Sequence, residues 1–433
     1  MARAKKEAAL TPEERLQAAL VPDWEWPYKL PENWCWLKLV ESFDNHTDSK
    51  KKIKQKDYLV KGKLAVVDQG QELIGGYTND VEKSYSGALP IVIFGDHTRC
   101  IKFVDFPFAQ GADGVKVLRP KPYYLPKAFY YALQSVNIPN LGYRRHFPLF
   151  NKFSIPLPPF AEQQRIVDRI ESLFAKLDEA KEKAQAVVDS FETRKAAILH
   201  KAFTGELTAK WRKEHGVGME SWEVRTLDSV CSSIFDGDHM PPPKAESGIP
   251  FLVISNVNTG HLTFENTRFV PQEYYDTLSD TRKPQLGDVL YTLVGSFGIP
   301  VVVNSKRPFC FQRHMALLRP IDVSPQFLWY ILQTPEMYDK VSSIATGTAQ
   351  LTVPIKGLRA MTIPRPNIAE QVEIVRILDG FFAREQSAKE AAEAVIDQID
   401  LMKKSILARA FRGELGTNDP SEESAVELLK QII

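Results

Sequence analysis

Polar side chains cluster in turns beside short apolar segments throughout the chain. In the first half they are Lys51, Lys52, Lys54, Gln69, Gln71, His97, Arg99, Arg144 and Arg145. In the second half they are His239, Asn256, Asn258, Ser296, Arg313, His314, Thr348 and Gln350. Arginine can donate two hydrogen bonds to guanine, and asparagine or glutamine can pair with adenine, in the major groove of DNA. These residues are candidates for base or phosphate contacts, and ordinary turn chemistry is the alternative at each position.

The motifs of the common catalytic sites are missing from the sequence. It contains neither a Gly-x-x-x-x-Gly-Lys-Ser/Thr phosphate loop nor a Gly-x-Ser-x-Gly elbow, and it has no His-Glu-x-x-His zinc motif. The Asp-Gly-Asp-His run at 236–239 offers two carboxylates from one loop, fewer oxygens than a hard cation takes. We therefore predict no metal site and no catalytic activity for the chain itself. An enzyme with an unrecognised active site is an alternative.

Length and composition indicate a folded protein of two or three domains. The chain has 433 residues, 44% of them hydrophobic and 25% charged, with a net charge of +1. No apolar stretch approaches the roughly 18–20 residues of a membrane span, and the first residues lack the apolar core of a signal peptide. The four cysteines form no Cys-x-x-Cys pair. We expect a soluble, cytoplasmic protein with buried thiols.

The sequence contains an internal repeat. Residues 155–207 begin IPLPPFAEQQRIV and end AFTGEL, and residues 363–415 begin IPRPNIAEQVEIV and end AFRGEL, at a constant offset of 208. Fainter similarity lies upstream, where LPKAFYYALQS resembles SPQFLWYILQT and ENWCWLKL resembles ESWEVRTL. The chain is therefore a tandem duplication in which a variable segment and a repeated segment alternate.

Both repeated segments show the spacing of a coiled-coil helix, because apolar residues recur at alternating steps of three and four. The predicted seam residues of the first copy are Ile166, Ile170, Leu173, Leu177, Val187, Phe191 and Ile198. Those of the second copy are Ile374, Leu378, Phe381, Val395, Ile399, Met402 and Ile406. Arg194 interrupts the first seam and Glu385 the second. Prolines before each helix and Gly205 and Gly413 after each one mark the ends.

Each predicted helix is about 40 residues, or ~60 Å, long. A helix of this length cannot bury its apolar stripe on one small domain, and the other copy has a matching seam. We predict an intramolecular antiparallel coiled coil that relates the two copies by a pseudo-twofold. The alternative is a coiled coil between two chains.

The remaining segments read as mixed α/β domains, so the predicted fold class is α+β. Short apolar runs such as LPIVIFGD and DVLYTLVG alternate with turn residues. Residues 1–157 carry 23 Lys+Arg against 17 Asp+Glu, a surplus that suits a polyanionic partner. The predicted order is an N-terminal helical extension (1–27), an α/β domain (28–157), a helix (158–207), a second α/β domain (208–365), a second helix (366–415) and a tail with a short helix (416–433).

The repeated IPxPxxAEQ signature, the heptads that follow it, and the segments LGDVLYTLVGSFGIPVVV and GTAQLTVPIKGL resemble the specificity (S) subunit of type I restriction–modification systems. The resemblance covers nearly the whole chain. It implies that the α/β domains are target-recognition domains, that each reads one half of a split asymmetric DNA sequence, and that the helices set the spacing.

The same resemblance implies a set of partners. Two methyltransferase (M) subunits, which use S-adenosylmethionine to methylate adenine, would dock on the helices. Restriction (R) subunits, which use ATP and Mg²⁺, would join through them. The chain itself would hold no cofactor and contact no membrane. A coiled-coil scaffold that never binds DNA is the alternative function.

Overall fold

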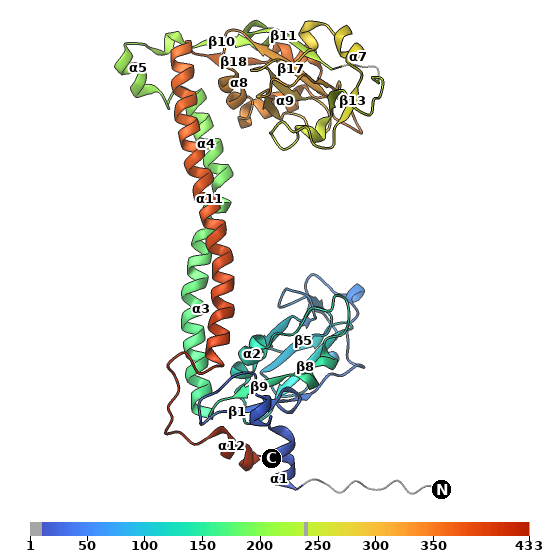
Figure 1. The fold of residues 1–433 in the computed structure, drawn as a ribbon, viewed down its shortest axis with the longest axis vertical. Helices are drawn as coiled ribbons and strands as arrows, with labels where there is room; N and C mark the ends of the chain where they lie inside the picture. The colour runs from blue at the N-terminus through green and yellow to red at the C-terminus, as the bar shows by residue number, and fades with distance from the viewer. Residues whose placement is uncertain (1–10, 238–240, 433) are drawn as a thin grey trace. The chain divides into compact units, whose positions relative to one another are not determined.

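The computed structural model describes residues 11–237 and 241–432 (Figure 1). Contacts between Cα atoms divide the chain into two compact units. One unit joins Met1–Ala184 to Ala394–Ile433, and the other is Gln185–Glu393. Each unit therefore combines one α/β domain with a segment from each of the two helical arms.

The α/β domain of the first unit contains two main sheets. An antiparallel sheet has the order β2-β8-β5-β6, and a second sheet has the order β4-β3-β7, in which β3 and β7 run parallel. A two-stranded ribbon, β1-β9, connects the domain to the first arm. The bounds are β1 (Cys35–Lys38), β2 (Phe43–Asn45), β3 (Leu64–Val67), β4 (Gly76–Thr78), β5 (Ile91–Gly95), β6 (Ile101–Val104), β7 (Phe108–Gln110), β8 (Val115–Pro120), α2 (Pro126–Ser135) and β9 (Ser154–Leu157).

The α/β domain of the second unit repeats this topology. Its sheets have the orders β11-β17-β14-β15 and β13-β12-β16, with β12 and β16 parallel, and its ribbon is β10-β18. The duplication therefore extends to the α/β domains, where the sequence similarity is faint. The bounds are β10 (Glu223–Thr226), α6 (Leu227–Val230), β11 (Cys231–Asp236), β12 (Ile249–Leu252), β13 (Arg268–Val270), α7 (Gln272–Thr277), β14 (Val289–Thr292), β15 (Pro300–Val302), β16 (Cys310–Phe311), β17 (Met315–Pro320), α8 (Pro325–Ile331), α9 (Pro335–Ile344), α10 (Ile355–Ala360) and β18 (Thr362–Arg365).

The central strand of each larger sheet is buried on both faces. Along β5, Val92 and Phe94 pack into the cluster that contains α2, whereas Ile91 and Ile93 pack against residues of β3 and β7. The alternation follows from the two-residue period of a strand. The same arrangement recurs around β14 in the second domain. The larger sheet thus lies between a helix and the smaller sheet.

The helical arms are α3 (Phe160–Asp189) with α4 (Phe191–Phe203), and α11 (Ile368–Ala410). Ser190 separates α3 from α4, and its hydroxyl donates to the Ala186 carbonyl, 2.5 Å away. The prediction of one uninterrupted first helix is therefore wrong at this residue. The Ala186 carbonyl also accepts from the Ser190 backbone N–H at 3.1 Å, and the Ser190 carbonyl accepts from the Arg194 N–H at 3.0 Å, so the interruption is confined to this residue and the first arm continues beyond it.

The arms pair antiparallel in each unit. In the first unit Lys403 pairs with Asp178, and Lys181 lies 2.7 Å from Asp400. In the second unit Arg194 Nε lies 2.7 Å from a carboxylate oxygen of Glu385. Arg194 and Glu385 are the residues that interrupt the two heptad patterns, so the interruptions neutralise one another. The prediction of an intramolecular antiparallel pair is confirmed.

Three of the predicted seam residues do not face the other arm. Val187, Val395 and Met402 are 36%, 41% and 49% exposed, so the prediction that they face the other arm is wrong. Their neighbours Ile396 and Lys403 are more buried. The Lys403 ammonium lies 5.0 Å from the centre of the Phe174 ring, and the Lys389 ammonium lies 5.1 Å from the centre of the Phe191 ring. Lysine can occupy a seam in this way because its aliphatic stem covers an apolar partner while its charge stays near water.

The other predicted seam residues differ in burial. Ile166, Ile170, Ile374, Leu378 and Ile399 are buried. Leu173, Leu177, Phe191, Ile198, Phe381 and Ile406 are half-buried. Apart from Ile399, the buried residues lie where an α/β domain adds its own apolar surface to the helix pair.

The second arm begins with a fully buried carboxylate, that of Glu370. Its Oε1 accepts hydrogen bonds of 2.6 Å from Thr208 Oγ1 and from Arg212 Nη1, and its Oε2 accepts one of 2.9 Å from Trp222 Nε1. Thr208 follows the end of the first arm. The Glu of the AEQ signature therefore ties the start of one arm to the segment that leaves the other.

The first arm repeats this contact with Glu162. Its carboxylate accepts a 2.6 Å hydrogen bond from Thr417, a threonine that follows the second arm as Thr208 follows the first. Its cation is Arg165, which also pairs with Glu422 of the C-terminal tail at 2.7 Å. Burial raises the pKa of Glu162, and the bonds from Thr417 and Arg165 oppose that rise. The tail continues to α12 (Ala425–Ile432), which packs on the first domain through Ala425 and Leu429.

The Gln of the AEQ signature orients each α/β domain on its arm. Gln163 accepts from Leu125 N–H at 2.7 Å and donates to the carbonyls of Tyr123 and Pro158. Gln371 accepts from Ser324 N–H at 2.9 Å and donates to the Pro366 carbonyl at the same distance. Both amides are fully buried. The repeated signature is thus explained by two anchoring contacts.

Candidate DNA interface

In the first domain, three loops meet at one end of the sheets. Gln69 follows β3, His97 follows β5, and Tyr143 lies in the loop after α2. His97 N–H donates to Gln69 Oε1 at 3.2 Å, and Gln69 Nε2 donates to the Asp113 carbonyl at 3.0 Å. Both the oxygen and the nitrogen of the Gln69 amide are therefore hydrogen-bonded within the domain, and this side chain joins the loops.

An exposed aromatic and cationic group stands on these loops. The His97 ring stacks on Tyr143, with centroids 4.9 Å apart and planes 15° from parallel. Tyr143 is 86% exposed, and Arg144 and Arg145 beside it are exposed as well. Within the described residues neither arginine forms an ion pair. Planar guanidinium groups with unpaired donors suit phosphate oxygens and guanine.

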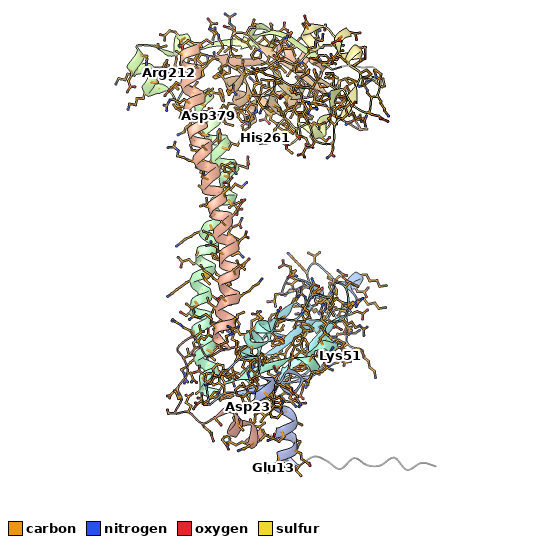
Figure 2. The ribbon with its side chains drawn as sticks, in the orientation of Figure 1. Glu13, Asp23, Lys51, Arg212, His261 and Asp379 are labelled. Carbon is orange, nitrogen blue, oxygen red and sulfur yellow. The ribbon has the colours of Figure 1, made fainter. Side chains whose placement is uncertain are left out.

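The remaining candidates of this domain are dispersed. Arg99 has a φ of 62° and donates to the Ile138 carbonyl at 3.0 Å, which makes it a loop-holding residue. Lys51 is half-buried and labelled in Figure 2, and Lys52 lies 3.8 Å from Asp113. Lys54 and Gln71 are exposed. Gln71 and Arg99 line a cavity of about 550 Å³ between the domain and its arm.

In the second domain, three of the predicted residues line one cavity of about 350 Å³. They are Arg313 and His314, from the turn between β16 and β17, and Gln350, from the loop after α9. Asp236 at the end of β11 lines the same cavity. The β-bridges from Thr352 to Val294 and to Thr346 hold the loops together. A carboxylate, an imidazole, a guanidinium and an amide thus converge from three separate segments.

The electrostatics of this cavity favour a neutral imidazole. Burial, and secondarily the positive charge of Arg313, lower the pKa of His314. A neutral ring offers one donor and one acceptor. Ser296 and Thr348 are exposed on the adjoining loops. The cavity can therefore present donors and acceptors at fixed positions, which is the chemistry of base discrimination.

Two candidates in the second domain do not reach this surface. Asn256 is 2% exposed, its Oδ1 accepts from Val253 N–H and its Nδ2 donates to the Glu265 carbonyl, each at 3.0 Å. The prediction that Asn256 contacts DNA is wrong, because its amide closes a turn. Asn258 is exposed and lines a cavity of about 910 Å³ between the domain and its arm. His239 lies outside the described residues.

Two residues of these surfaces, Tyr143 in the first domain and Asp236 in the second, were not among the DNA-binding candidates predicted from the sequence. Tyr143 adjoins the predicted arginines, and its 86% exposure is what makes it a stacking surface. Asp236 lies in the Asp-Gly-Asp-His run, a polar turn that was weighed for base contacts and for a metal, but it was not chosen as a DNA-binding residue. Among the described residues, no cluster of His, Cys, Asp and Glu has the composition of a metal site, and no helix there is long and apolar enough to span a membrane.

A family model described as the type I restriction modification DNA specificity domain matches residues 31–188 and again 219–397. The two matches coincide with the two structural repeats and cover most of the chain. The chain belongs to this family. It carries two DNA specificity domains, and each match extends from an α/β domain into the helical arm that follows it.

Individual members of the family are more distant. The chain is 27% identical over 305 residues to the EcoKI specificity subunit of Escherichia coli K12, covering 65% of this chain and 64% of that protein. It is 25% identical over 285 residues to the MjaVIII specificity subunit of Methanocaldococcus jannaschii, covering 62% and 63%. The matched region is thus less than two thirds of each of these relatives.

Solved structures show the same fold. A chain from a study of assembly and conformational transition of the type I R-M system matches with a TM-score of 0.64 at 21% identity, covering 90% of this chain and all of that one. The HsdS subunit from Thermoanaerobacter tengcongensis matches with a TM-score of 0.56, also at 21% identity and with the same coverage. The fold of this chain therefore also occurs in solved structures.

Proposed function

We propose that this specificity chain binds a bipartite, asymmetric DNA sequence, one half through each α/β domain. The observation that carries the proposal is that one topology presents two different polar surfaces. The first domain offers Tyr143, Arg144 and Arg145, and the second offers Asp236 and Gln350 beside Arg313 and His314. Different donor and acceptor sets select different bases, so the two half-sites differ in sequence.

The alternative is a coiled-coil scaffold that does not bind DNA. The surplus of positive charge in residues 1–157, with 23 Lys+Arg against 17 Asp+Glu, favours DNA binding. So does the exposure of Arg144 and Arg145 beside the Tyr143 ring, since neither arginine forms an ion pair with a described residue. A scaffold alone gives no reason for the polar cavity that Arg313, His314 and Gln350 line.

We further propose that the arms dock two methyltransferase subunits. In the first unit α11 exposes Val395 and Met402, which are 41% and 49% exposed and lie seven residues apart on one face, with Leu401, 64% exposed, beside that face. Apolar residues spaced along one face of a helix are the usual anchor for helices of a partner. The docked subunits would supply S-adenosylmethionine and adenine methylation, and restriction subunits using ATP and Mg²⁺ would join through them. The chain itself performs no reaction, and we place it in the cytoplasm with its DNA.

The decisive experiment is a DNA-binding titration of the full chain, with and without the methyltransferase subunits, combined with methylome sequencing of cells with and without the gene. We expect adenine methylation at one split motif, lost on deletion. Replacing residues 216–362 by another second domain should alter one half of the motif and leave the other unchanged. If both halves changed, or if the chain and its complex failed to retard any duplex, the proposal would be refuted.

A further inference from the structure

A cavity of about 240 Å³ lies in the first domain, away from Tyr143 and its neighbours. Three segments form its walls: the loop that follows β2, the loop that follows β4, and the end of β7. The residues that line it are His46, Asp48, Lys51, Lys83, Tyr85, Ser86, Gly87 and Gln110. Of these, sequence reasoning had identified Lys51 alone.

Two ammonium groups face the cavity from opposite loops. Lys51 Nζ donates to the Ser84 carbonyl at 3.3 Å, and Lys83 Nζ donates to the Lys52 carbonyl at 3.4 Å. Each ammonium has three donors, so each retains capacity for a ligand. Neither forms an ion pair with a carboxylate of the described residues. Asp48 is the carboxylate of the lining, and its Oδ1 accepts from the backbone N–H of Lys50 at 2.8 Å.

A buried amide supplies an independent indication of a ligand. Gln110 is 5% exposed, and its Oε1 accepts from Asp48 N–H at 3.2 Å. Its Nε2 has no acceptor among the described residues. A buried donor without a partner is unfavourable and uncommon in folded proteins. An acceptor entering this cavity would satisfy it.

The aromatic wall is held in place without the ligand. Tyr85 Oη lies 3.2 Å from His46 Nδ1, and the Tyr85 ring stacks on Phe108 with centroids 5.4 Å apart. Burial raises the pKa of Tyr85, so the phenol remains protonated at neutral pH. The cavity is therefore already formed and its walls add no negative charge beyond that of Asp48.

We propose that this cavity binds a phosphate group, held by the ammonium groups of Lys51 and Lys83 and by the Gln110 amide. Its volume exceeds the roughly 10–15 Å³ that one water requires and is below the roughly 300–1,000 Å³ of sites for whole small molecules. It thus suits a compact anionic group. The inference rests on the proposed function when the phosphate belongs to the DNA backbone, and a free phosphate ion has the same chemistry.

The test uses the full chain and two probes, inorganic phosphate and a duplex of unrelated sequence. The double variant Lys51→Met with Lys83→Met removes both charges. The variant Gln110→Glu keeps the acceptor for Asp48 N–H and replaces the free donor by a carboxylate oxygen. Lys61→Met with Lys63→Met is the matched control, because these lysines are exposed in the same segment and do not line the cavity. Circular dichroism verifies the fold of each variant.

We expect inorganic phosphate to raise the melting temperature of the unaltered chain and of the control, but of neither cavity variant. For DNA, losing one phosphate contact should lower the slope of log K against log salt by about 0.9. Between 50 and 200 mM salt, the affinity of a cavity variant would then fall about 3.5-fold less than that of the unaltered chain.

The two probes separate the sources of the phosphate. A response to inorganic phosphate that depends on Lys51 and Lys83, without any change in the DNA salt slope, supports the site with free phosphate as its ligand. That response would still support the site if the chain bound no DNA, although the proposed function would then fail. Cavity variants that match the control in both assays would overturn the phosphate site.

Discussion

Glu370→Gln should destabilise the second unit far more than Glu162→Gln destabilises the first, although the two residues are equivalent in the repeat. Both side chains are fully buried and both accept a threonine hydroxyl. They differ in their cations. The Arg212 side chain is 9% exposed and forms an ion pair with Glu370 at 2.6 Å. The Arg165 side chain is 38% exposed and pairs both with Glu162 and with Glu422.

The magnitude follows from what each substitution leaves behind. Removing one partner of a buried ion pair costs about 3–5 kcal/mol, because the other charge stays buried without compensation. In addition, the new amide N–H₂ would face either the Arg212 guanidinium or the Trp222 N–H, both of them donors. Arg165 can keep Glu422 and reach water, so Glu162→Gln should cost only about 1 kcal/mol. The raised pKa of Glu162 agrees, since burial already favours its neutral form.

Differential scanning calorimetry of the full chain is the assay. At about 2–4 °C per kcal/mol for a unit of this size, Glu370→Gln should lower one transition by about 6–20 °C and Glu162→Gln by about 2–4 °C. Glu373→Gln is the control, since Glu373 pairs with the exposed Arg376 on the same helix. Adding Arg212→Met to Glu370→Gln should restore part of the loss. If Glu370→Gln melted like the control, or if the double variant were simply additive, the buried-charge argument would be refuted.

Three further outcomes are expected. Arg194→Met alone should destabilise the arms by about 1–2 kcal/mol, because it leaves the Glu385 carboxylate unpaired. Arg194→Met with Glu385→Leu removes both charges and should melt near the unaltered chain; a double variant less stable than the single would contradict this. Arg313→Met should cost about 1–3 kcal/mol of DNA-binding free energy and relax the recognised sequence at one position. Asn256→Ala should instead cost about 1–3 kcal/mol of folding stability and leave the recognised sequence unchanged, and methylome sequencing would distinguish the two. Because the pKa of His314 is lowered in the folded chain, the unfolded chain binds the extra proton first, so stability should fall as pH drops from 7 toward 5; calorimetry of His314→Gln should show a smaller decline.

The helical arms were predictable because their pattern is periodic. Steps of three and four over five heptads, repeated at a fixed offset, specify a helix pair without knowledge of the α/β domains. The error at Val395 and Met402 has a definite cause. Sequence reasoning chose one apolar residue at each step, whereas the chain buries the next residue more deeply, which is Ile396 after Val395 and Lys403 after Met402. The stem of Lys403 covers Phe174, so a charged residue takes a place that the pattern gave to methionine.

The candidate interface was predictable only as a set of loops. Arg313 and His314 are adjacent in sequence, whereas Gln350 and Asp236 come from distant segments, and they meet because a parallel pair of strands and the loop after α9 bring these segments together. Long-range pairing of this kind leaves no local periodicity. The direction of an amide is equally hidden, since Asn256 and Asn258 are two residues apart and only one faces solvent. Burial, and not residue type, separates a turn-closing side chain from an available one.

The anchoring of the recognition domains bears on how this chain can vary. Gln163 and Gln371 hold their domains only through backbone groups: Leu125 N–H, Ser324 N–H and carbonyl oxygens of neighbouring residues. Because backbone groups are the same for every residue type, side chains elsewhere in a domain can change without loss of the anchor. A replacement domain needs only the same local backbone path to seat on its arm. Leucine in place of either glutamine would therefore disturb the seating of every domain carried there, whereas changes at Arg313 or Gln350 would alter what one domain reads.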